Sequence, residues 1–497
     1  MLDVGHNATA GAAWSGSQYG LRKIKPDLFR ELIGEHFESL HNLNNPPISL
    51  KLKSPQMQYI VRDWNRLSPI ISNTFGGVLS LAKGGLASGW GAGVYRFNAR
   101  DLRGFPIGEE DLRESYNDVE SHIGVCGAND DLEPYFGGDT ALLPPLPLTD
   151  FYARFLTHYQ RARPQFKREG AAVGHSRLAV LTEPRNGRAA YEYGNLEFFR
   201  PRDPAIYNPA YTVEEMVRAG AVDYRAGMLA LHYRETESCV EVTCRNLSTG
   251  SEEVFRGRRL ALGAGAFNTA RIVLASNRDY ETRLPILDNP MACVPFFELS
   301  RIGAAAPERD TSLAQLNLVM EDGEWDEPLQ GSLYGASGPL RSDALFSLPF
   351  SIRANMAWTR HLAPAMGMAI LFYPGVESPR NSLRLRSTGE LEVQFDPVPP
   401  QSAERRLLKL FRSLRYVTAA ALIQRPAMGA GLHFAGPLPM RVSPTRYETD
   451  RNGRLFDTRS VYIVDGACFT RLPAKNLTFT IMANALRIGR HIAAELA

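Results

Sequence analysis

The chain of 497 residues carries 56 basic and 53 acidic side chains, which gives a formal net charge of +3. This balance offers no electrostatic reason to expect nucleic acid or an anionic membrane surface as a partner. Hydrophobic residues make up 44% and charged residues 22%, which excludes a disordered or fibrous chain, and the length allows two large domains.

The cysteines are odd in number and form no CxxC pair, a pattern that predicts buried thiols in a reducing compartment rather than a disulfide framework or a metal site. They are Cys126, Cys239, Cys244, Cys293 and Cys468. No basic segment followed by an apolar run opens the chain, and the apolar runs are shorter than the ~18 residues of a spanning helix. We therefore expect a cytoplasmic protein without a membrane-spanning segment.

The first half of the chain contains three local patterns. Residues 2–5, LDVG, resemble the end of an apolar strand that stops at an acid and a glycine. Residues 239–244, CVEVTC, alternate with a period of two and predict a strand. Residues 260–262 predict an apolar strand, followed by a small-residue bend and a helix that starts near Asn268.

The second half predicts a hairpin from residues 381–387 and 390–396, and a helix over residues 403–423. A turn at Asn452–Gly453 precedes a buried strand, SVYIVDG, that ends at Asp465. The last helix covers residues 477–497, with one apolar stripe of Ile481, Ala485, Ile488 and Ile492. Two strand–bend–helix units separated by other material predict an α/β sheet with insertions.

Five glycines lie between Gly84 and Gly93, in the segment KGGLASGWGAG. Glycines at this density let backbone amides approach a flat or anionic ligand, because no Cβ stands in the way. A tight surface loop is the alternative interpretation of this segment alone.

This loop resembles the GGxSxxW segment that lies beside the isoalloxazine ring in the glucose–methanol–choline (GMC) family of FAD-dependent alcohol oxidoreductases. Gly84, Gly85, Ser88 and Trp90 keep that pattern, and Gly91 follows. The run DLRGFPIGEEDLRESYNDVESHIGVCG over residues 101–127 is similar to the next segment of the family, with a phenylalanine in place of its tryptophan. Some relatives attach FAD through a histidine directly before the tryptophan. The glycine at position 89 therefore implies non-covalent FAD.

The bend after residues 260–262 is similar to a family segment that passes beneath the cofactor, which implies contacts from Gly263, Ala264 and Gly265. We do not interpret it as the dinucleotide fingerprint. That fingerprint belongs to the first βαβ unit and is followed by an acid about 20 residues later.

The C-terminal segments carry the most specific resemblance. GLHFAGPLPM gives His433, with a proline where the family has threonine or cysteine; SVYIVDG gives Asp465 and Gly466; and Asn476 precedes the last helix. The resemblance implies that His433 is the catalytic base, that Asn476 orients the alcohol and that Asp465 contacts FAD through its backbone. The alternatives are an ordinary histidine and a helix N-cap at Asn476.

The family begins with a strand, a GxGxxG loop, a helix and a second strand that ends in a ribose-binding acid. The chain opens inside this second strand, with Asp3 in the place of that acid. Loss of the first strand would leave buried backbone groups unpaired, at about 1–3 kcal/mol each. We therefore expect the true start of the protein to lie upstream.

The resemblance implies an α/β fold in which a Rossmann-like FAD-binding domain, without its N-terminal strand, loop and helix, is interleaved with an α+β substrate domain built on an antiparallel sheet. The expected FAD-binding domain comprises residues 1–125, 220–300 and 430–497, and the substrate domain comprises residues 126–219 and 301–429. The implied reaction is oxidation of the CH–OH group of a small-molecule alcohol, with hydride passing to FAD and then to an unidentified electron acceptor. The alternatives are a flavin-free homologue that acts as a binding or scaffold protein, and a lyase in which the flavin is structural.

Overall fold

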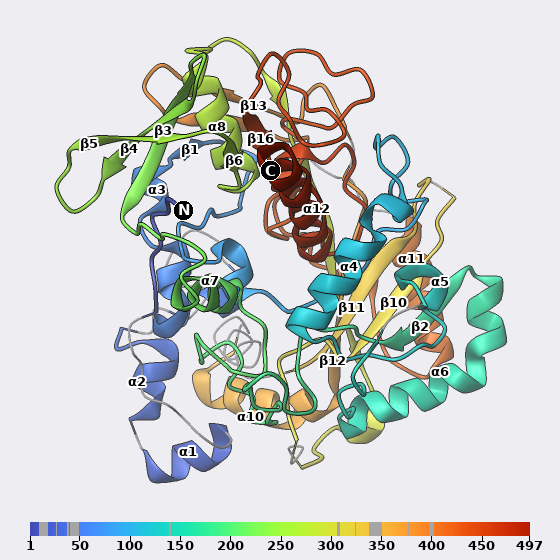
Figure 1. The fold of residues 1–497 in the computed structure, drawn as a ribbon. Helices are drawn as coiled ribbons and strands as arrows, with labels where there is room; N and C mark the ends of the chain where they lie inside the picture. Colours follow the sequence, from blue (N-terminus) through green and yellow to red (C-terminus); the bar gives the residue numbers. More distant parts are fainter. Residues whose placement is uncertain are drawn as a thin grey trace.

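The computed structural model describes residues 1–8, 18–25, 27–36, 39, 49–138, 141–305, 309–323, 325–336, 350–375, 377–396 and 402–497. Its strands form one large antiparallel sheet and several smaller ones, with helices between and around them (Figure 1). The mixed α/β class with an antiparallel second sheet is therefore confirmed.

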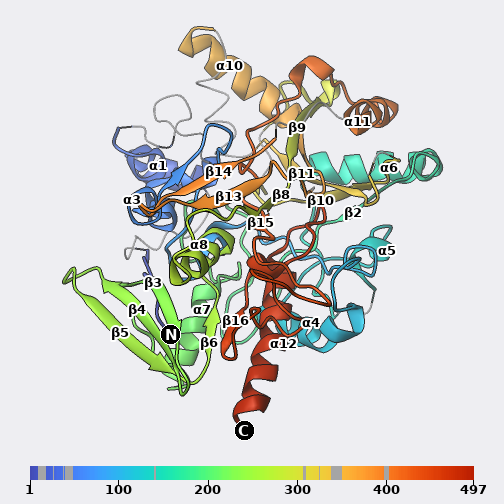
Figure 2. The same cartoon turned by 90° about the horizontal axis from the view of Figure 1, so that it is seen from above.

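The large sheet has five antiparallel strands in the order β2-β10-β11-β12-β9. Their bounds are β2 Ala171–His175, β9 Met291–Phe297, β10 Leu316–Met320, β11 Leu329–Gly335 and β12 Met366–Phe372. Helices α6 (Asp150–Arg168) and α11 (Ser402–Ser413) lie beside this sheet, and α10 (Ile352–Leu362) lies at its end (Figures 1 and 2). One sheet face meets α6 and α11 in an aromatic core that includes Phe155, Phe296 and Phe411.

A second group of strands lies on the opposite side of the molecule, near the N-terminus (Figure 2). β6 (Leu260–Leu262) pairs in parallel with β16 (Val461–Ile463), and α8 (Ala266–Ser276) follows β6 directly. An antiparallel sheet of β3 (Met228–Glu235), β4 (Val240–Asn246) and β5 (Glu252–Gly257) packs against α8. These elements confirm the strands predicted near residues 239–244, 260–262 and 460–466.

The remaining strands are short. β1 (Ile70–Ile71), β14 (Leu391–Gln394), β13 (Ser382–Leu385) and β7 (Leu284–Pro285) form a four-stranded sheet, and β13 and β14 are the predicted hairpin. β15 (Phe434–Ala435) pairs with β8 (Leu287–Asp288). The pairing of β15 with β8 brings the chain before residue 289 beside the segment of residues 433–435.

The last helix, α12 (Thr478–Leu496), packs against α4 (Glu109–Ile123) near the centre of the molecule (Figure 1). The two rings of Tyr116 and Phe479 lie 4.9 Å apart, and the Tyr116 hydroxyl is 2.7 Å from Thr480 Oγ1. The other helices are α1 Gln18–Ile24, α2 Leu28–Ile33, α3 Trp64–Leu67, α5 Glu133–Phe136 and α7 Pro209–Arg218. Within the described residues, no helix is both long enough and apolar enough to cross a bilayer.

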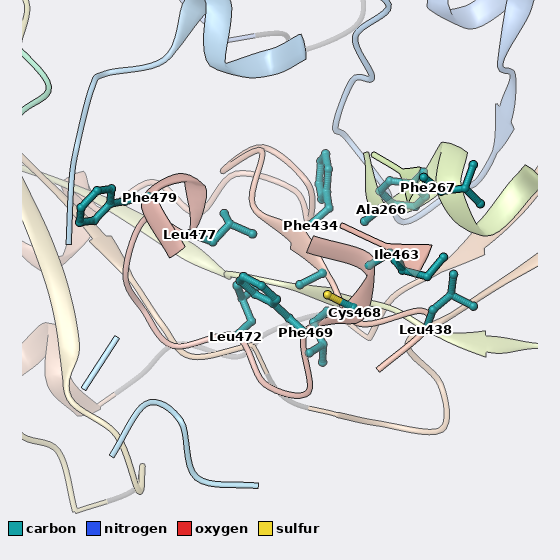
Figure 3. Packing of buried hydrophobic residues seen from close by; sticks show 14 of the residues in the cluster. Ala266, Phe267, Phe434, Leu438, Ile463, Cys468, Phe469, Leu472, Leu477 and Phe479 are labelled. Atoms are coloured by element: carbon teal, nitrogen blue, oxygen red, sulfur yellow. The ribbon is translucent and has the colours of Figure 1, made fainter. Parts of the chain in front are cut away.

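Side chains of α8, β15, β16 and the start of α12 meet in one apolar core (Figure 3). The rings of Phe267 and Phe434 lie 4.9 Å apart at an angle of 75°. Ile463, Cys468 and Leu472 are fully buried there. This core fixes the bend after β6 relative to the first turn of α12.

Two predicted helices differ from the structure. The helix expected over residues 403–423 ends at Ser413, because Arg415 adopts a left-handed φ of 68° and Val417 then exchanges backbone hydrogen bonds with Phe297 at the edge of β9. In α12 the predicted stripe is displaced: Ile488 is buried, but Ile481 lines a cavity. The interior of the protein covers more than one stripe of this helix, so apolar spacing alone did not identify its buried face.

Candidate active site

A cavity with a volume of about 1440 Å³ lies between the chain start and β6. Residues 1–4 form one wall, and residues 260–268 form another. The glycine loop contributes Gly84 and Gly85, and the start of α12 closes one end. No described strand pairs with the second edge of β6, so the sheet edge itself faces this cavity.

The bend after β6 is held open toward the cavity by buried hydrogen bonds. Asp465 Oδ2 accepts bonds from the Gly265 amide at 2.8 Å and from Thr269 Oγ1 at 2.5 Å, and the Thr269 hydroxyl accepts from the Ala264 amide at 3.1 Å. Gly265 has φ of 84°, and a Cβ built there meets nothing within 4 Å. The backbone of Gly263, Ala264 and Gly265 is thus exposed to a ligand, and the Asp465 side chain supports it from behind.

Asp465 also shapes the neighbouring turn, because its Oδ1 accepts the Ala467 amide at 2.9 Å. Burial raises the pKa of this carboxyl, although the hydrogen bonds oppose that effect. Gly466, which follows, lines the same cavity. Residues 465–466 thus line the cavity, and Thr269 is a supporting residue that the sequence did not identify.

The glycine loop divides into two parts. Gly84 and Gly85 line the cavity, and Gly85, at φ of 61°, faces open space. Ser88 and Trp90 do not line it: Ser88 Oγ donates to the Lys83 carbonyl at 2.8 Å, and Trp90 Nε1 donates to the Tyr207 carbonyl at 2.8 Å. These side chains fasten the loop to the protein.

Gly91 also lies outside the cavity. A Cβ at Gly91 would stand 3.7 Å from the Tyr334 hydroxyl, and a Cβ at Gly93 would stand 3.1 Å from Asn476 Oδ1. The far end of the glycine loop therefore reaches β11 and the predicted catalytic asparagine rather than the cavity.

Asp3 lies at the opposite wall of the cavity and accepts a hydrogen bond from the Tyr224 hydroxyl at 2.8 Å. Burial raises the pKa of this carboxyl above its usual value. The backbone amide of Asp3 is bonded to the Arg225 carbonyl at 3.0 Å. An acceptor for a ligand hydroxyl group is thus fixed at this wall.

The two predicted catalytic residues lie in contact, although 43 positions separate them in the chain. Asn476 Nδ2 is 3.2 Å from His433 Nε2, and the imidazole ring stacks near Phe372 at 4.8 Å between ring centroids. Asn476 precedes the N-cap of α12, which is Leu477. The alternative that Asn476 is the cap of this helix is therefore wrong.

A third polar residue, Asn289, determines which nitrogen of His433 carries the proton. Asn289 Nδ2 donates to the carbonyl groups of Tyr373 (2.8 Å), Pro473 (3.1 Å) and Leu472 (3.4 Å). Its Oδ1 consequently faces His433 Nδ1 at 3.0 Å and can only accept. The neutral ring therefore carries its proton on Nδ1 and presents the Nε2 lone pair to Asn476.

Asn289 carried no signal in the sequence, because it belongs to none of the segments that resemble the family. Only the pairing of β8 with β15 brings it to His433. Lys475 was missed in the same way. Its ammonium group is buried against Asp101 and also donates to the Arg96 carbonyl at 3.1 Å and the Tyr135 carbonyl at 2.6 Å.

The Lys475 contacts give a structural role to Asp101, the first residue of the run that resembles the family. A buried ion pair is tolerated when further hydrogen bonds satisfy both charged groups, as these two carbonyls do for Lys475. The pair fixes the backbone immediately before Asn476. The Asp101 carboxylate also accepts the Asn98 amide at 2.8 Å, which anchors its own loop.

His433 is only 7% exposed. Burial, with a smaller effect from the positive charge of Lys51, lowers the pKa of His433 to about 3. The imidazole is therefore neutral around pH 7 and can accept a proton. Protonation at Nε2 in this dry position becomes favourable only when negative charge develops beside it.

The chemical types of the groups that line the cavity match those that a flavin dinucleotide requires. Two open glycine positions, at Gly85 and Gly265, allow close approach to a flat or anionic group, and Asp3 provides a hydroxyl acceptor at the far wall. The first turn of α12 has free amides at the cavity, which favour negative charge there. Among the described residues, no group of three or more His, Cys, Asp or Glu side chains could hold a metal ion.

Known proteins resemble this chain in part of its sequence and in its fold. Residues 379–485 match the family model described as GMC oxidoreductase. The fold is similar to formate oxidase from Aspergillus oryzae RIB40, with a TM-score of 0.54 and 11% identity over 84% of this chain and 85% of that chain. It is also similar to pyridoxine 4-oxidase from Mesorbium loti, with a TM-score of 0.54 and 12% identity over 84% of this chain and 85% of that one. No curated protein matches the sequence significantly.

Proposed function

We propose that the chain is an FAD-dependent enzyme of the GMC type that oxidises the CH–OH group of a small-molecule alcohol to a carbonyl; the match of residues 379–485 to the GMC oxidoreductase model supports this. The observation that carries this proposal is the His433–Asn476 pair at 3.2 Å. Neither side chain lines the glycine-backed cavity, but their neighbours in the chain, Leu432, Phe434 and Leu477, do. A neutral base and an amide donor on one oxygen are what removal of a hydroxyl proton requires.

The chain supplies positioning and proton transfer. The alcohol hydroxyl group would replace the direct contact of Asn476 with His433: Asn476 Nδ2 would donate to the hydroxyl oxygen, and His433 Nε2 would accept the hydroxyl proton. Asn289 holds the proton on Nδ1 throughout, so Nε2 remains the accepting atom. FAD, when bound, supplies the two-electron acceptor for the hydride, a role that protein side chains cannot fill.

The cofactor contacts that we propose come from both sides of the cavity. Gly84, Gly85, Gly263, Ala264, Gly265 and Gly466 supply open backbone, and Asp3 supplies the ribose acceptor. Gly89 occupies the loop position before Trp90 and has no side chain for a covalent link. We therefore assign FAD as a non-covalent cofactor of this chain.

One observation favours a second candidate, a flavin-free homologue with a binding role. The cavity of about 1440 Å³ exceeds the ~300–1,000 Å³ of usual small-molecule sites. Its wall includes the unpaired edge of β6 and half-buried apolar side chains of β3, among them Leu229 and Leu231. A protein or peptide ligand would cover such a surface.

The test is a visible absorption spectrum of the chain after incubation with FAD and removal of free cofactor, followed by anaerobic addition of alcohols. The proposal expects a protein-bound flavin band that an alcohol bleaches. The variant His433→Gln should retain the band but lose most of the bleaching rate, while His361→Gln, at an exposed histidine of α10, should behave as the wild type. A colourless protein at saturating FAD would favour the binding role instead.

A further inference from the structure

One face of the large antiparallel sheet carries polar side chains in a row. On β11, Gln330, Ser332 and Tyr334 alternate with apolar residues, so all three point to the same face. We call these three residues the polar row. The residues between them belong to the opposite face, where Leu329 and Leu333 pack into the aromatic core with α6 and α11.

The polar row faces the predicted catalytic pair. Gln330 lies directly opposite Phe372 of β12 in the antiparallel register, and directly opposite residues share a face with Cβ atoms about 4.5–5.5 Å apart. The ring of Phe372 contacts the ring of His433 at 4.8 Å. A single aromatic ring therefore separates Gln330 from the proposed base.

The other end of the row reaches Asn476. Asn317 on β10 donates to Ser332 Oγ at 3.1 Å and accepts from the Tyr95 hydroxyl at 2.9 Å. Tyr95 and Asn476 both stand 3.1 Å from the position of a Cβ on Gly93. The polar row, the glycine loop and the catalytic pair are thus linked by a chain of short contacts.

Gln330 is the unusual member of this row. Its side chain is 2% exposed, and neither Oε1 nor Nε2 has a hydrogen-bond partner among the described residues. Each buried group without a partner costs about 1–3 kcal/mol. Gln315, directly before β10, shows the usual arrangement: it is also buried, and its Oε1 accepts the Thr149 amide at 2.7 Å.

A buried amide with a free donor and a free acceptor is complementary to a ligand group that can both accept and donate. A hydroxyl group meets this requirement, whereas a hydrocarbon chain would leave the amide unpaired. The dry position makes the discrimination strong, because water cannot replace the missing ligand group at no cost.

We propose that Gln330 is a substrate-specificity residue, and that the substrate is an alcohol with a second hydroxyl group, which the Gln330 amide binds while the first hydroxyl group replaces the direct contact of Asn476 with His433. This inference rests on the proposed oxidation of a CH–OH group and names its substrate class. It separates polyhydroxylated substrates from monofunctional aliphatic alcohols and from sterols.

The experiment compares straight-chain terminal diols of three to six carbons with monoalcohols of equal length, in flavin reduction by the FAD-loaded chain. The wild type should prefer at least one diol in kcat/KM by about tenfold or more. In Gln330→Leu this preference should fall about ten- to a hundredfold. Gln315→Leu is the matched control, and its diol preference should equal that of the wild type.

Thermal stability provides a second measurement that does not need turnover. Gln330→Leu removes an unpaired amide and should keep or raise the melting temperature, whereas Gln315→Leu should lower it, because the Thr149 amide loses its acceptor. A clear loss of stability in Gln330→Leu would show that its amide has partners within the protein and would overturn the inference.

The outcomes also separate this inference from the proposed function. If alcohols reduce the flavin but the wild type prefers no diol, or Gln330→Leu keeps the preference, the specificity role fails and the oxidoreductase stands. If no alcohol reduces the flavin, the proposed function fails, and the stability comparison still decides whether the Gln330 amide is free.

Discussion

Replacement of Asn289 by leucine tests the arrangement of the proposed active site most directly. Leucine has nearly the same size but cannot bind His433 Nδ1 or donate to the three carbonyl groups that the Asn289 amide contacts. We expect His433 to lose its fixed tautomer while remaining in place, because Phe372 still contacts its ring.

The structure sets the magnitude of the effect. The Leu472 carbonyl keeps another donor, the Gly375 amide at 2.7 Å, so the Tyr373 and Pro473 carbonyls are the ones left without a donor from Asn289. At about 1–3 kcal/mol each, the variant should lose about 2–6 kcal/mol of unfolding free energy. Loss of the Nδ1 hydrogen bond, worth a similar 1–3 kcal/mol, should lower kcat for flavin reduction by about ten- to a hundredfold.

The assay has two parts. Anaerobic stopped-flow reduction gives kcat and KM, and nitrogen NMR of the histidine-labelled protein identifies the protonated ring nitrogen, with His433→Gln assigning the signal. The wild type should show a proton on Nδ1 of His433, and Asn289→Leu should show a mixture of tautomers. Asn381→Leu is the control for stability loss alone, since Asn381 is buried and accepts the Asp396 amide at 2.8 Å.

Two results would refute this reasoning. One is an Asn289→Leu variant with wild-type kcat and a single Nδ1-protonated His433. The other is an Asn381→Leu variant with the same loss of kcat, because general destabilisation would then explain both.

Three further predictions concern the cavity and the buried titrating groups. Gly265→Val should abolish FAD binding, because the new side chain enters the cavity. Gly250→Val is the control: Gly250 has a similar φ of 77° in an exposed turn, so this variant should carry the same backbone strain and still bind FAD. Equal FAD affinity in both variants would contradict the cavity assignment. His433→Gln should make the unfolding free energy depend less on pH below pH 6.5. The pKa of His433 in the folded protein, about 3, lies below the usual 6.5, so the wild type loses up to about 1.4 kcal/mol of unfolding free energy per pH unit as pH falls from 6.5 toward 3. Urea titrations in which both proteins show the same change of unfolding free energy with pH would disprove this. The unfolding free energy of Asp288→Asn should increase relative to that of the wild type as pH rises. Burial raises the pKa of Asp288 to about 8, so the wild type loses stability between pH 4 and 8. A difference in unfolding free energy that does not change with pH would rule this out.

The sequence determined the local elements around the cavity. Strands at residues 260–262 and 461–463, and the bend with Gly263 and Gly265, follow from apolar runs bounded by small residues, because these features depend on neighbours in the chain. The ordered set of His433, Asp465 and Asn476 likewise came from the sequence. The structure then brought His433 and Asn476 into contact.

The sequence could not separate residues of the glycine loop that face the cavity from those that fasten it. Gly85 faces the cavity, while Ser88 and Trp90 bind the Lys83 and Tyr207 carbonyls. The local pattern is the same for both groups. Their directions depend on segments more than 100 residues away, such as the one that contains Tyr207.

Only the tertiary structure identified Asn289, Lys475 and Gln330. Asn289 lies 144 positions from His433, and Lys475 lies 374 positions from Asp101. Gln330 has no sequence signal at all, since its significance is the absence of a partner for a buried amide. Helix and strand patterns reflect the chemistry of near neighbours in the chain, but the proton position on His433 and the free amide of Gln330 depend on desolvation and contacts that exist only after distant segments have packed together.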